Sequence, residues 1–313
     1  MNLASIDIGT NAVLLLIMKK NGEILKELLD VSTITRLGEG LIKTGRLSFE
    51  AIERTLRTLE RYGVIMAAHD ARPAGCFGTS ALREAENSGQ FIRMAREAAG
   101  MEVKVLSERE EACYTYLSVA RDRSIPGQNL IVVDIGGGST EIARGSREGL
   151  NDYVSLSIGT VKLTEQFIRH DPPLEEELNR LSRFIRDRVA VARQEVLCKT
   201  EQGDIAESVI GVGGTMTTLA ALVLRLADFD KEKIDGLFIS RGELEDWIAL
   251  LTGMQVIERK RIAGMEPGRE DLLLQGIILM KEVLNSFQAE GVTVSTRGAR
   301  HGVLYETAKN VKC

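Results

Sequence analysis

The sequence predicts an α/β protein built from two domains, and three observations support this. Apolar strand-like runs alternate with helical stretches, a pattern typical of partly parallel sheets with helices on their faces. The run Asp7-Ile8-Gly9 recurs as Asp134-Ile135-Gly136 after a shift of 127 residues, each time after an apolar strand and before a turn. The 313 residues suffice for two domains of the usual size, about 100–200 residues each. We therefore expect two α/β domains that face each other.

The first third of the chain is expected to hold three strands within residues 1–35 and then a long helix. This helix is predicted from Ser48, a plausible N-cap, to about His69. A strand, a helix, a strand and a helix follow at residues 74–77, 89–99, 103–106 and 110–120. The stretch 121–129 contains a Pro-Gly pair and is predicted to be the linker. The expected domains are therefore 1–124 and 125–313, and it is left open whether the last helix packs back on the first domain.

The second half repeats the alternation of strands and helices. Its predicted elements are a strand ending near residue 135, two helices on either side of Asp-Pro-Pro at 171–173, a strand at 209–212, a helix at 217–226, helices at 241–251 and 269–288, a strand at 292–295 and a last helix from 299.

The composition is ordinary for a soluble globular protein, with 44% hydrophobic and 27% charged residues. The net charge of -5 disfavours a broad nucleic-acid surface, but it leaves an anionic substrate open because a metal ion and a few arginines can reverse the field of one site. The N-terminus does not read as a signal peptide, and its longest apolar run is too short to span a membrane. The four cysteines lack metal-site or C-x-x-C spacing, which fits a reduced, cytoplasmic compartment.

Glycine-rich turns follow three of the apolar strands. Glycines let backbone N–H groups approach a phosphate closely, and an Asp at a strand end can hold a divalent cation. A single Asp-x-Gly turn fits an ordinary β-hairpin equally well. Two copies at matching positions, together with Gly211-Val212-Gly213-Gly214-Thr215, favour phosphate binding.

Two charged motifs each admit two interpretations. Ser107-Glu108-Arg109-Glu110-Glu111-Ala112 is, taken alone, more typical of a solvated first helical turn. Its place one strand-helix unit before the linker favours a carboxylate that activates water. Thr79 and Arg83 follow another strand, where a hydroxyl and a guanidinium could contact phosphate, although an N-capped turn with a surface arginine fits equally well.

Together these motifs resemble the exopolyphosphatase/guanosine pentaphosphate phosphohydrolase (Ppx/GppA) family, which belongs to the superfamily of actin, Hsp70-type chaperones and sugar kinases. The matching blocks span almost the whole chain, at residues 5–11, 36–40, 79–85, 107–112, 134–141, 158–165, 211–215 and 298–302. The resemblance implies two ribonuclease-H-like α/β domains with the active site in the cleft between them. It also implies a short form of the family, without a C-terminal helical extension.

The resemblance further implies residue roles. Glu111 is expected to orient or deprotonate water, and Asp134 and Glu141 to hold Mg²⁺ and the attacking water, with Asp7 as a further metal ligand. The implied phosphate-binding residues are Thr10, Asn11, Arg36, Arg83, Gly136, Gly137, Gly138, Ser139, Gly213, Gly214, Thr215 and Arg300.

The chain departs from the family pattern at four positions. Ala12 stands where the family has a serine, and Leu14 stands where it has a basic residue. Lys162 stands in place of an arginine, and a point charge cannot make the planar two-pronged contact of a guanidinium. His301 replaces a glutamate.

We therefore expect a Mg²⁺-dependent hydrolase that releases terminal orthophosphate from inorganic polyphosphate, with a preference for short chains, as a possible homodimer without nucleic-acid or membrane partners. Guanosine pentaphosphate is the alternative substrate. An ATP-dependent kinase of small molecules and a non-catalytic polyphosphate or nucleotide sensor are the alternatives of another class.

Overall fold

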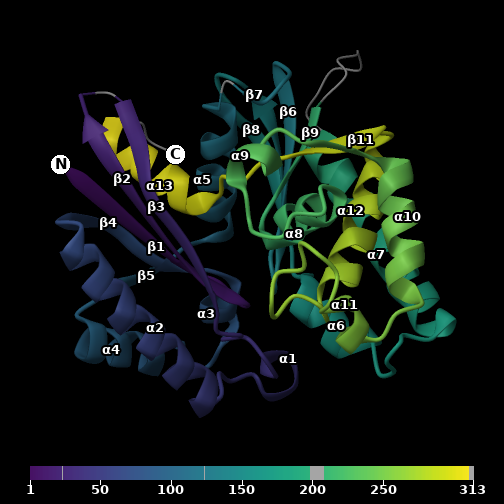
Figure 1. The fold of residues 1–313 in the computed structure, drawn as a ribbon, viewed down its shortest axis with the longest axis horizontal. Helices are drawn as coiled ribbons and strands as arrows, with labels where there is room; N and C mark the ends of the chain where they lie inside the picture. The colour runs from purple at the N-terminus through teal and green to yellow at the C-terminus, as the bar shows by residue number, and fades with distance from the viewer. Residues whose placement is uncertain (23, 123, 198–207, 310–313) are drawn as a thin grey trace. The chain divides into compact units, whose positions relative to one another are not determined.

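The computed structural model describes residues 1–22, 24–122, 124–197 and 208–309, and the chain divides into two units. Unit 1 comprises Met1–Ser118 and Ala299–Cys313, and unit 2 comprises Val119–Gly298. Each unit holds one mixed sheet with helices, which is the α/β class that the sequence predicts (Figure 1). The predicted boundary at 124/125 falls later in the chain than this division, and the segment after residue 298 joins unit 1.

The sheet of unit 1 has the strand order β3-β2-β1-β4-β5. Its strands are β1 (Asn2–Ile8), β2 (Ala12–Asn21), β3 (Ile24–Ile34), β4 (Ala71–Gly78) and β5 (Val103–Val105). The first three strands form an antiparallel meander, and β4 and β5 then add parallel strands on the other side of β1.

Helices cover both faces of this sheet. The helices of unit 1 are α1 (Leu41–Thr44), α2 (Phe49–Ala68), α3 (Ser80–Glu84), α4 (Ser88–Ala99), α5 (Glu108–Ala120) and α13 (Ala299–Lys309). The predicted N-cap Ser48 is confirmed, since its hydroxyl accepts a hydrogen bond from the Ala51 amide at 3.2 Å. Alternate β2 residues point to opposite faces: Leu15 joins the core with α2 and α4, whereas Leu16 joins the core with Leu304 of α13.

The last helix belongs to unit 1 because it packs closely on α5 and on the sheet. A Cβ added at Gly302 would lie 2.1 Å from the Tyr114 carbonyl oxygen, so only glycine allows this approach of α13 to α5. The Tyr114 hydroxyl donates to Glu306 at 2.7 Å. Helix α13 also contacts β1, β2 and β4 (Figure 1).

Unit 2 extends the same plan, with the strand order β10-β11-β9-β6-β7-β8. Its strands are β6 (Asn129–Ile135), β7 (Thr140–Ser146), β8 (Gly149–Leu156), β9 (Ser208–Val212), β10 (Phe238–Ser240) and β11 (Gly291–Val294). Strands β6, β7 and β8 form an antiparallel meander, and β9 pairs parallel to β6 as β4 does to β1.

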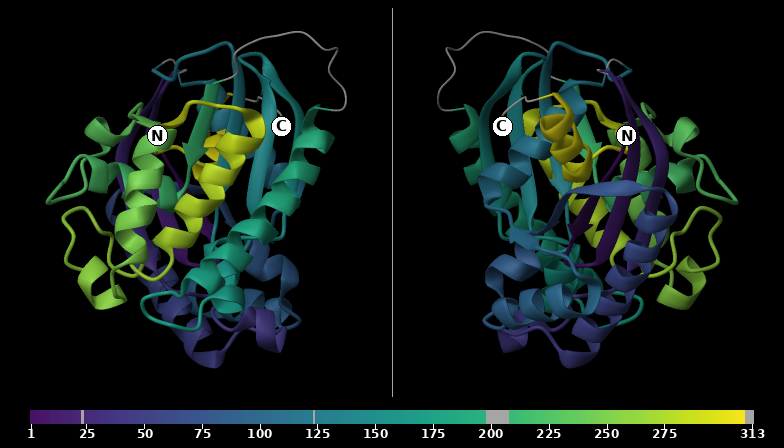
Figure 2. Two further views of the ribbon diagram at one scale, coloured as in Figure 1. Left: turned by 90° about the vertical axis from the view of Figure 1, so that its right-hand side faces the viewer. Right: turned by 90° about the vertical axis from the view of Figure 1, so that its left-hand side faces the viewer.

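The helices of unit 2 are α6 (Thr160–Phe167), α7 (Glu175–Leu197), α8 (Gly214–Val223), α9 (Lys231–Ile234), α10 (Arg241–Thr252), α11 (Val256–Arg259) and α12 (Leu273–Phe287). Helices α7 and α12 pack side by side (Figure 2). Helix α7 is amphipathic as predicted, with Leu181, Ile185 and Val189 buried at helical spacing. Among the described residues, no helix combines the length and apolar character that crossing a membrane needs.

The internal duplication predicted from the sequence is confirmed at the level of single hydrogen bonds. Asp7 pairs with Leu14 across β1 and β2, and Asp134 pairs with Glu141 across β6 and β7. The Gly9 amide donates to the Ala12 carbonyl at 2.9 Å, and the Gly136 amide donates to the Ser139 carbonyl at 3.0 Å. Each residue of the first copy lies 127 positions before its counterpart, so the two turns have the same register.

The cysteines differ in oxidation state, which their spacing in the sequence did not predict. Cys76 is a free and buried thiol, whereas Cys113 takes part in a disulfide. Cys198 and Cys313 lie outside the described residues.

The start of the segment predicted as the linker is fixed by hydrogen bonds and an ion pair within unit 2. The guanidinium of Arg147 donates to the carbonyls of Ala120 at 3.0 Å and Asp122 at 2.5 Å, where a cation also complements the C-terminal end of α5. The Asp122 carboxylate, 4% exposed, accepts hydrogen bonds from the Ser124 amide and hydroxyl and pairs with Arg297 at 2.5 Å. Unit 2 runs from Val119 to Gly298, so Asp122 and Arg297 lie near its two ends. Their ion pair therefore joins the first and the last segment of unit 2.

We expect Asp122→Asn to lower the free energy of unfolding by about 1–3 kcal/mol at neutral pH, because hydrogen bonds to a buried charge are lost. Although burial opposes it, pairing with Ser124 and Arg297 lowers the pKa of Asp122 below its usual 3.8. A lowered folded-state pKa stabilises the fold above the unfolded-state value and loses this effect as the pH falls through the folded-state value. Denaturant unfolding should therefore show a constant difference between pH 5 and 7 and a smaller one below about 3.8. A pH-independent difference would contradict this role of the carboxylate.

Candidate active site

The first predicted phosphate loop is the turn between β1 and β2, and it packs against the block at residues 36–40. Thr10 and Asn11 are both 5% exposed. The Asn11 carbonyl accepts from the Arg36 amide at 2.8 Å, and the Thr10 carbonyl accepts from the Gly38 amide at 2.9 Å. Arg36 has a φ of 49°, a left-handed conformation that is uncommon outside glycine and that lets the chain close over the loop. Thr10, Asn11 and the backbone of Arg36 are therefore brought together.

The two glutamates at the start of α5 have different environments. Glu110 accepts from the Ser107 amide at 2.9 Å while its own amide donates to the Ser107 hydroxyl at 3.3 Å, which is a reciprocal capping box. Its hydrogen bond from Lys104, with those from Ser107, lowers the pKa of Glu110 to about 2. Glu111 instead is only 8% exposed. The solvated-turn interpretation therefore fits Glu110, and Glu111 is the buried carboxylate.

Glu111 is held by Arg83, another of the predicted site residues. The Arg83 Nη1 donates to Glu111 Oε2 at 2.6 Å and to the Leu106 carbonyl at 3.0 Å. Both side chains are shielded, at 17% and 11% exposure. A short, charge-assisted hydrogen bond of this kind fixes the orientation of the carboxylate.

Arg300 forms an ion pair with Asp30, a carboxylate of unit 1. Its Nε and Nη2 donate to the two carboxylate oxygens of Asp30 at 3.1 and 2.8 Å, in the two-pronged geometry that suits a guanidinium. Burial alone would lower its pKa, but attraction to Asp30, Asp7 and Glu27 raises the pKa of Arg300. The predicted ligand Asp7 therefore lies within the electrostatic reach of Arg300.

In unit 2 the second turn places two predicted metal ligands side by side. Asp134 and Glu141 are direct cross-strand partners on β6 and β7, and such partners project from the same face with Cβ atoms about 4.5–5.5 Å apart. Glu141 is 2% exposed, and its Oε1 accepts from the Ser155 hydroxyl on β8 at 2.8 Å. Two neighbouring carboxylates offer the hard oxygen ligands that Mg²⁺ prefers.

The glycine loop at 136–138 is packed on the start of α6. The amides of Thr160 and Val161 donate to the carbonyls of Gly136 and Gly137 at 3.0 and 2.9 Å. A Cβ at Gly159 would lie 2.5 Å from the Gly137 carbonyl carbon, so this residue must be glycine for the two segments to meet. The conformation of the loop is thus set by the helix that follows β8.

The third glycine turn, at the start of α8, lies next to the carboxylate of Asp134. Gly213 has a φ of +92°, which favours glycine, and a Cβ there would lie 3.0 Å from Asp134 Oδ1. Thr215 is 3% exposed, and α8 starts at Gly214, three residues earlier than predicted. Unit 2 therefore brings Asp134 and Glu141 together with both of its predicted glycine loops.

One charged residue at this turn was not predicted from the sequence. Arg269 lies over the first residue of α8: a Cβ added at Gly214 would be 1.9 Å from the Arg269 Cζ. Its side chain is 12% exposed and pairs with Glu266, which also accepts from the Thr218 hydroxyl at 3.3 Å. A guanidinium and a helix N-terminus in one place both attract an anion. The available signal was an arginine directly after the Pro-Gly turn at 267–268.

The duplicated meander with its repeated Asp-x-Gly turn and flanking helices is the arrangement of the actin-like α/β fold. Within that class, the chain belongs to the Ppx/GppA phosphatase family, whose family model matches residues 16–311. It is therefore a phosphatase, and the family resemblance predicted from the motifs is confirmed.

Two curated relatives illustrate the range of the family. Exopolyphosphatase 2 of Mycobacterium tuberculosis (strain H37Rv) is 32% identical over 310 residues, which is 96% of this chain and 95% of that protein. A bifunctional 3-dehydroquinate synthase/phosphatase of Fusobacterium nucleatum is 33% identical over 317 residues, which is 98% of this chain but only 46% of that protein.

Solved structures show the same fold over the full length. A Ppx/GppA family member from Aquifex aeolicus shares 33% identity with a TM-score of 0.81, covering 100% of this chain and 99% of that one. An exopolyphosphatase from Cytophaga hutchinsonii shares 27% identity with a TM-score of 0.90, also covering 100% and 99% of the two chains.

We expect Gly159→Ala to deform the loop at 136–138, because the added Cβ meets backbone atoms that cannot rotate away. The overpacking should cost about 1–3 kcal/mol and should reduce phosphatase activity. Gly149→Ala is the matched control in the same unit, since nothing lies within 4 Å of its added Cβ, and its stability should change by no more than about 0.5 kcal/mol. Thermal unfolding and phosphate release measure the two effects. Equal behaviour of both variants would exclude this packing constraint.

Proposed function

We propose that the chain is a Mg²⁺-dependent exopolyphosphatase that releases terminal orthophosphate from inorganic polyphosphate, with Glu111 as the group that activates water. Family membership supplies the phosphatase class, and the curated Mycobacterium tuberculosis relative named exopolyphosphatase 2 supports this substrate. Guanosine pentaphosphate is the competing substrate.

The observation that carries the proposal is the buried ion pair of Glu111 and Arg83. Glutamate is among the side chains that commonly act as a general base, and a base must be held in a position from which it can reach the proton that it removes. Glu111 meets this requirement at 2.6 Å from the Arg83 Nη1, whereas its neighbour Glu110 is engaged in capping the helix. Arg83 uses one of its five N–H donors on Glu111 and one on the Leu106 carbonyl, which leaves others for a phosphate oxygen.

The glycine loops supply the binding of phosphate oxygens. Phosphoryl transfer depends mainly on positioning and on neutralising charge that spreads over the oxygens. The Gly136 amide is already used, because it donates to the Ser139 carbonyl within the turn. The backbone amides of Gly137 and Gly138 and the N-terminus of α8 below Arg269 are suited to this task, because they are fixed donors that need no reorganisation. Thr10 and Asn11 take the corresponding place in the first unit.

The donor set of unit 2 fits Mg²⁺. Asp134 and Glu141 present carboxylate oxygens from one face of the β6–β7 pair, and the buried hydroxyl of Ser139 stands in the same turn. When bound there, Mg²⁺ would neutralise phosphate charge and help to orient the water. Asp7 offers a carboxylate at the equivalent position of the first copy.

Phosphate release tests the substrate. The assay compares long polyphosphate, short polyphosphate, guanosine pentaphosphate and ATP, each with and without Mg²⁺ and with no acceptor molecule. We expect release from polyphosphate that depends on Mg²⁺ and is faster on short chains than on long ones, and equal rates on the two would contradict the preference for short chains. Faster turnover of guanosine pentaphosphate than of polyphosphate would identify guanosine pentaphosphate as the substrate instead. Transfer that requires an acceptor would indicate a kinase, and tight binding without turnover would indicate a sensor.

The adjacent glutamates give a matched pair of variants. We expect Glu111→Gln to reduce kcat on polyphosphate by about 10²–10⁴, the usual contribution of a general base. Glu110→Gln, one residue away, should keep near-normal kcat and lose only about 1 kcal/mol of stability through the weaker cap. Circular dichroism checks that both variants fold. Comparable activity of Glu111→Gln and the parent chain would refute the role of Glu111.

A further inference from the structure

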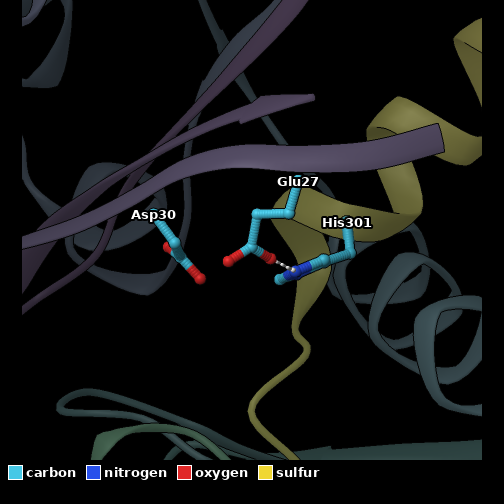
Figure 3. A group of neighbouring side chains, drawn as sticks. All are labelled: Glu27, Asp30 and His301. Atoms are coloured by element: carbon cyan, nitrogen blue, oxygen red, sulfur yellow. Dashed lines mark ion pairs between the residues drawn. The ribbon is translucent and has the colours of Figure 1, made fainter. Parts of the chain in front are cut away.

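A second group of potential metal ligands lies on unit 1 and shares no residue with the carboxylates of the proposed reaction. Glu27 and Asp30 come from β3, and His301 comes from α13 (Figure 3). Each offers one ligand atom, and these three atoms lie within 4.8 Å of one another. Figure 3 shows both carboxylates and the imidazole directed into the same space between the strand and the helix.

An irregularity in β3 puts the two carboxylates on one face. In a regular strand, residues three apart point to opposite faces. Here Glu27 pairs with Met18 and Asp30 pairs with Leu16, so Leu28 is an extra residue in the ladder. Met18 and Leu16 both point to the core that contains Leu304 of α13. The bulge therefore turns both acidic side chains toward the helix that carries His301.

The spacing of the group suits a bound ion. His301 is 1% exposed, and its Nε2 stands 3.7 Å from Glu27 Oε2, which is longer than a hydrogen bond. With metal–nitrogen and metal–oxygen bonds of about 2.0–2.2 Å, ligand atoms of one tetrahedral ion stand about 3.3–3.5 Å apart. Small side-chain movements within the observed 4.8 Å would bring all three ligands to that spacing.

Arg300 provides the outer support that such a site requires. Carboxylate ligands are commonly oriented by a hydrogen-bonded partner behind them. Arg300 donates to both oxygens of Asp30 at 2.8 and 3.1 Å and thereby fixes its plane. A carboxylate oxygen has two lone-pair directions, so hydrogen bonds to Arg300 do not by themselves prevent Asp30 from binding a metal ion.

We propose that Glu27, Asp30 and His301 bind one divalent transition-metal ion, of which zinc is the representative, with water as a further ligand. The imidazole nitrogen selects such an ion over Mg²⁺, which prefers oxygen ligands alone. The three ligands are different residues from the proposed Mg²⁺ ligands Asp134 and Glu141, so the proposal does not depend on the proposed function.

The test measures Zn²⁺ binding to the full-length protein by isothermal titration calorimetry in a large excess of Mg²⁺ and without substrate. We expect one equivalent of Zn²⁺ to bind and to raise the melting temperature. His301→Asn and Glu27→Gln should each weaken this binding by at least about 10–100-fold, the effect that even outer-shell changes have on metal affinity. Glu27→Gln is nearly isosteric, so it reports on the site even where loss of the buried imidazole disturbs folding.

His170→Asn is the matched control. His170 also faces a glutamate, Glu177, at 3.0 Å, but it belongs to no group of three potential metal ligands among the described residues. It should bind Zn²⁺ like the parent chain. Co²⁺ substitution identifies the ligands, since thiolate coordination would give sulfur-to-cobalt charge-transfer bands. Burial raises the pKa of Cys76 to about 12, which keeps that thiol protonated and unsuited to binding. Thiolate bands, or Zn²⁺ affinity that is the same in all variants, would overturn the proposal.

Discussion

The structure depends on a tight turn that occurs twice. In each unit the amide of a glycine after the first strand donates to the carbonyl three residues later, and the chain reverses in a single register. Register matters because a slip of one residue would move each side chain to the other face of the sheet. The Asp that precedes this glycine stands at the carboxyl end of a strand that also pairs in parallel with β4 or β9. The loops that follow those parallel strands therefore start at the same edge as the turn.

The two copies share this backbone but differ in their side chains. The residue opposite the Asp is Leu14 in unit 1 and Glu141 in unit 2, and the residue that accepts the turn hydrogen bond is Ala12 in one and Ser139 in the other. Unit 2 thus carries a carboxylate pair and a serine hydroxyl at these positions, whereas unit 1 has the apolar residues Leu14 and Ala12 there. Unit 1 instead gains its buried carboxylate from α5, where Arg83 holds Glu111. The two units therefore share the backbone geometry of the turn, and the residues that differ between the two copies give each unit its own chemistry.

Most helices and strands could be predicted because their apolar periodicity and glycine turns are local signals. Ser48 as an N-cap and the shift of 127 residues between the turns are examples. The features that were missed depend on contacts between residues far apart in the chain. Arg269 lies on Gly214 only because a loop folds back on α8. The sequence left open whether the last helix packs on the first domain, and this contact depends on Gly302, which lets α13 approach Tyr114. The bulge at Leu28 follows from pairing with β2, which no pattern within β3 reveals.

The arrangement of arginines resolves an apparent conflict between the net charge of -5 and an anionic substrate. Arg83, Arg269 and Arg300 are each paired with a carboxylate and shielded from solvent, at 17%, 12% and 12% exposure. Such pairing fixes the direction of a guanidinium, and it uses only part of the five donors. A fixed guanidinium loses less conformational entropy when it meets a phosphate than a free surface arginine would. Under the proposed function, affinity for phosphate would depend on a few oriented groups of this kind. The acidic surface elsewhere would have little influence, because exposed charges more than about 8 Å away are largely screened at physiological salt.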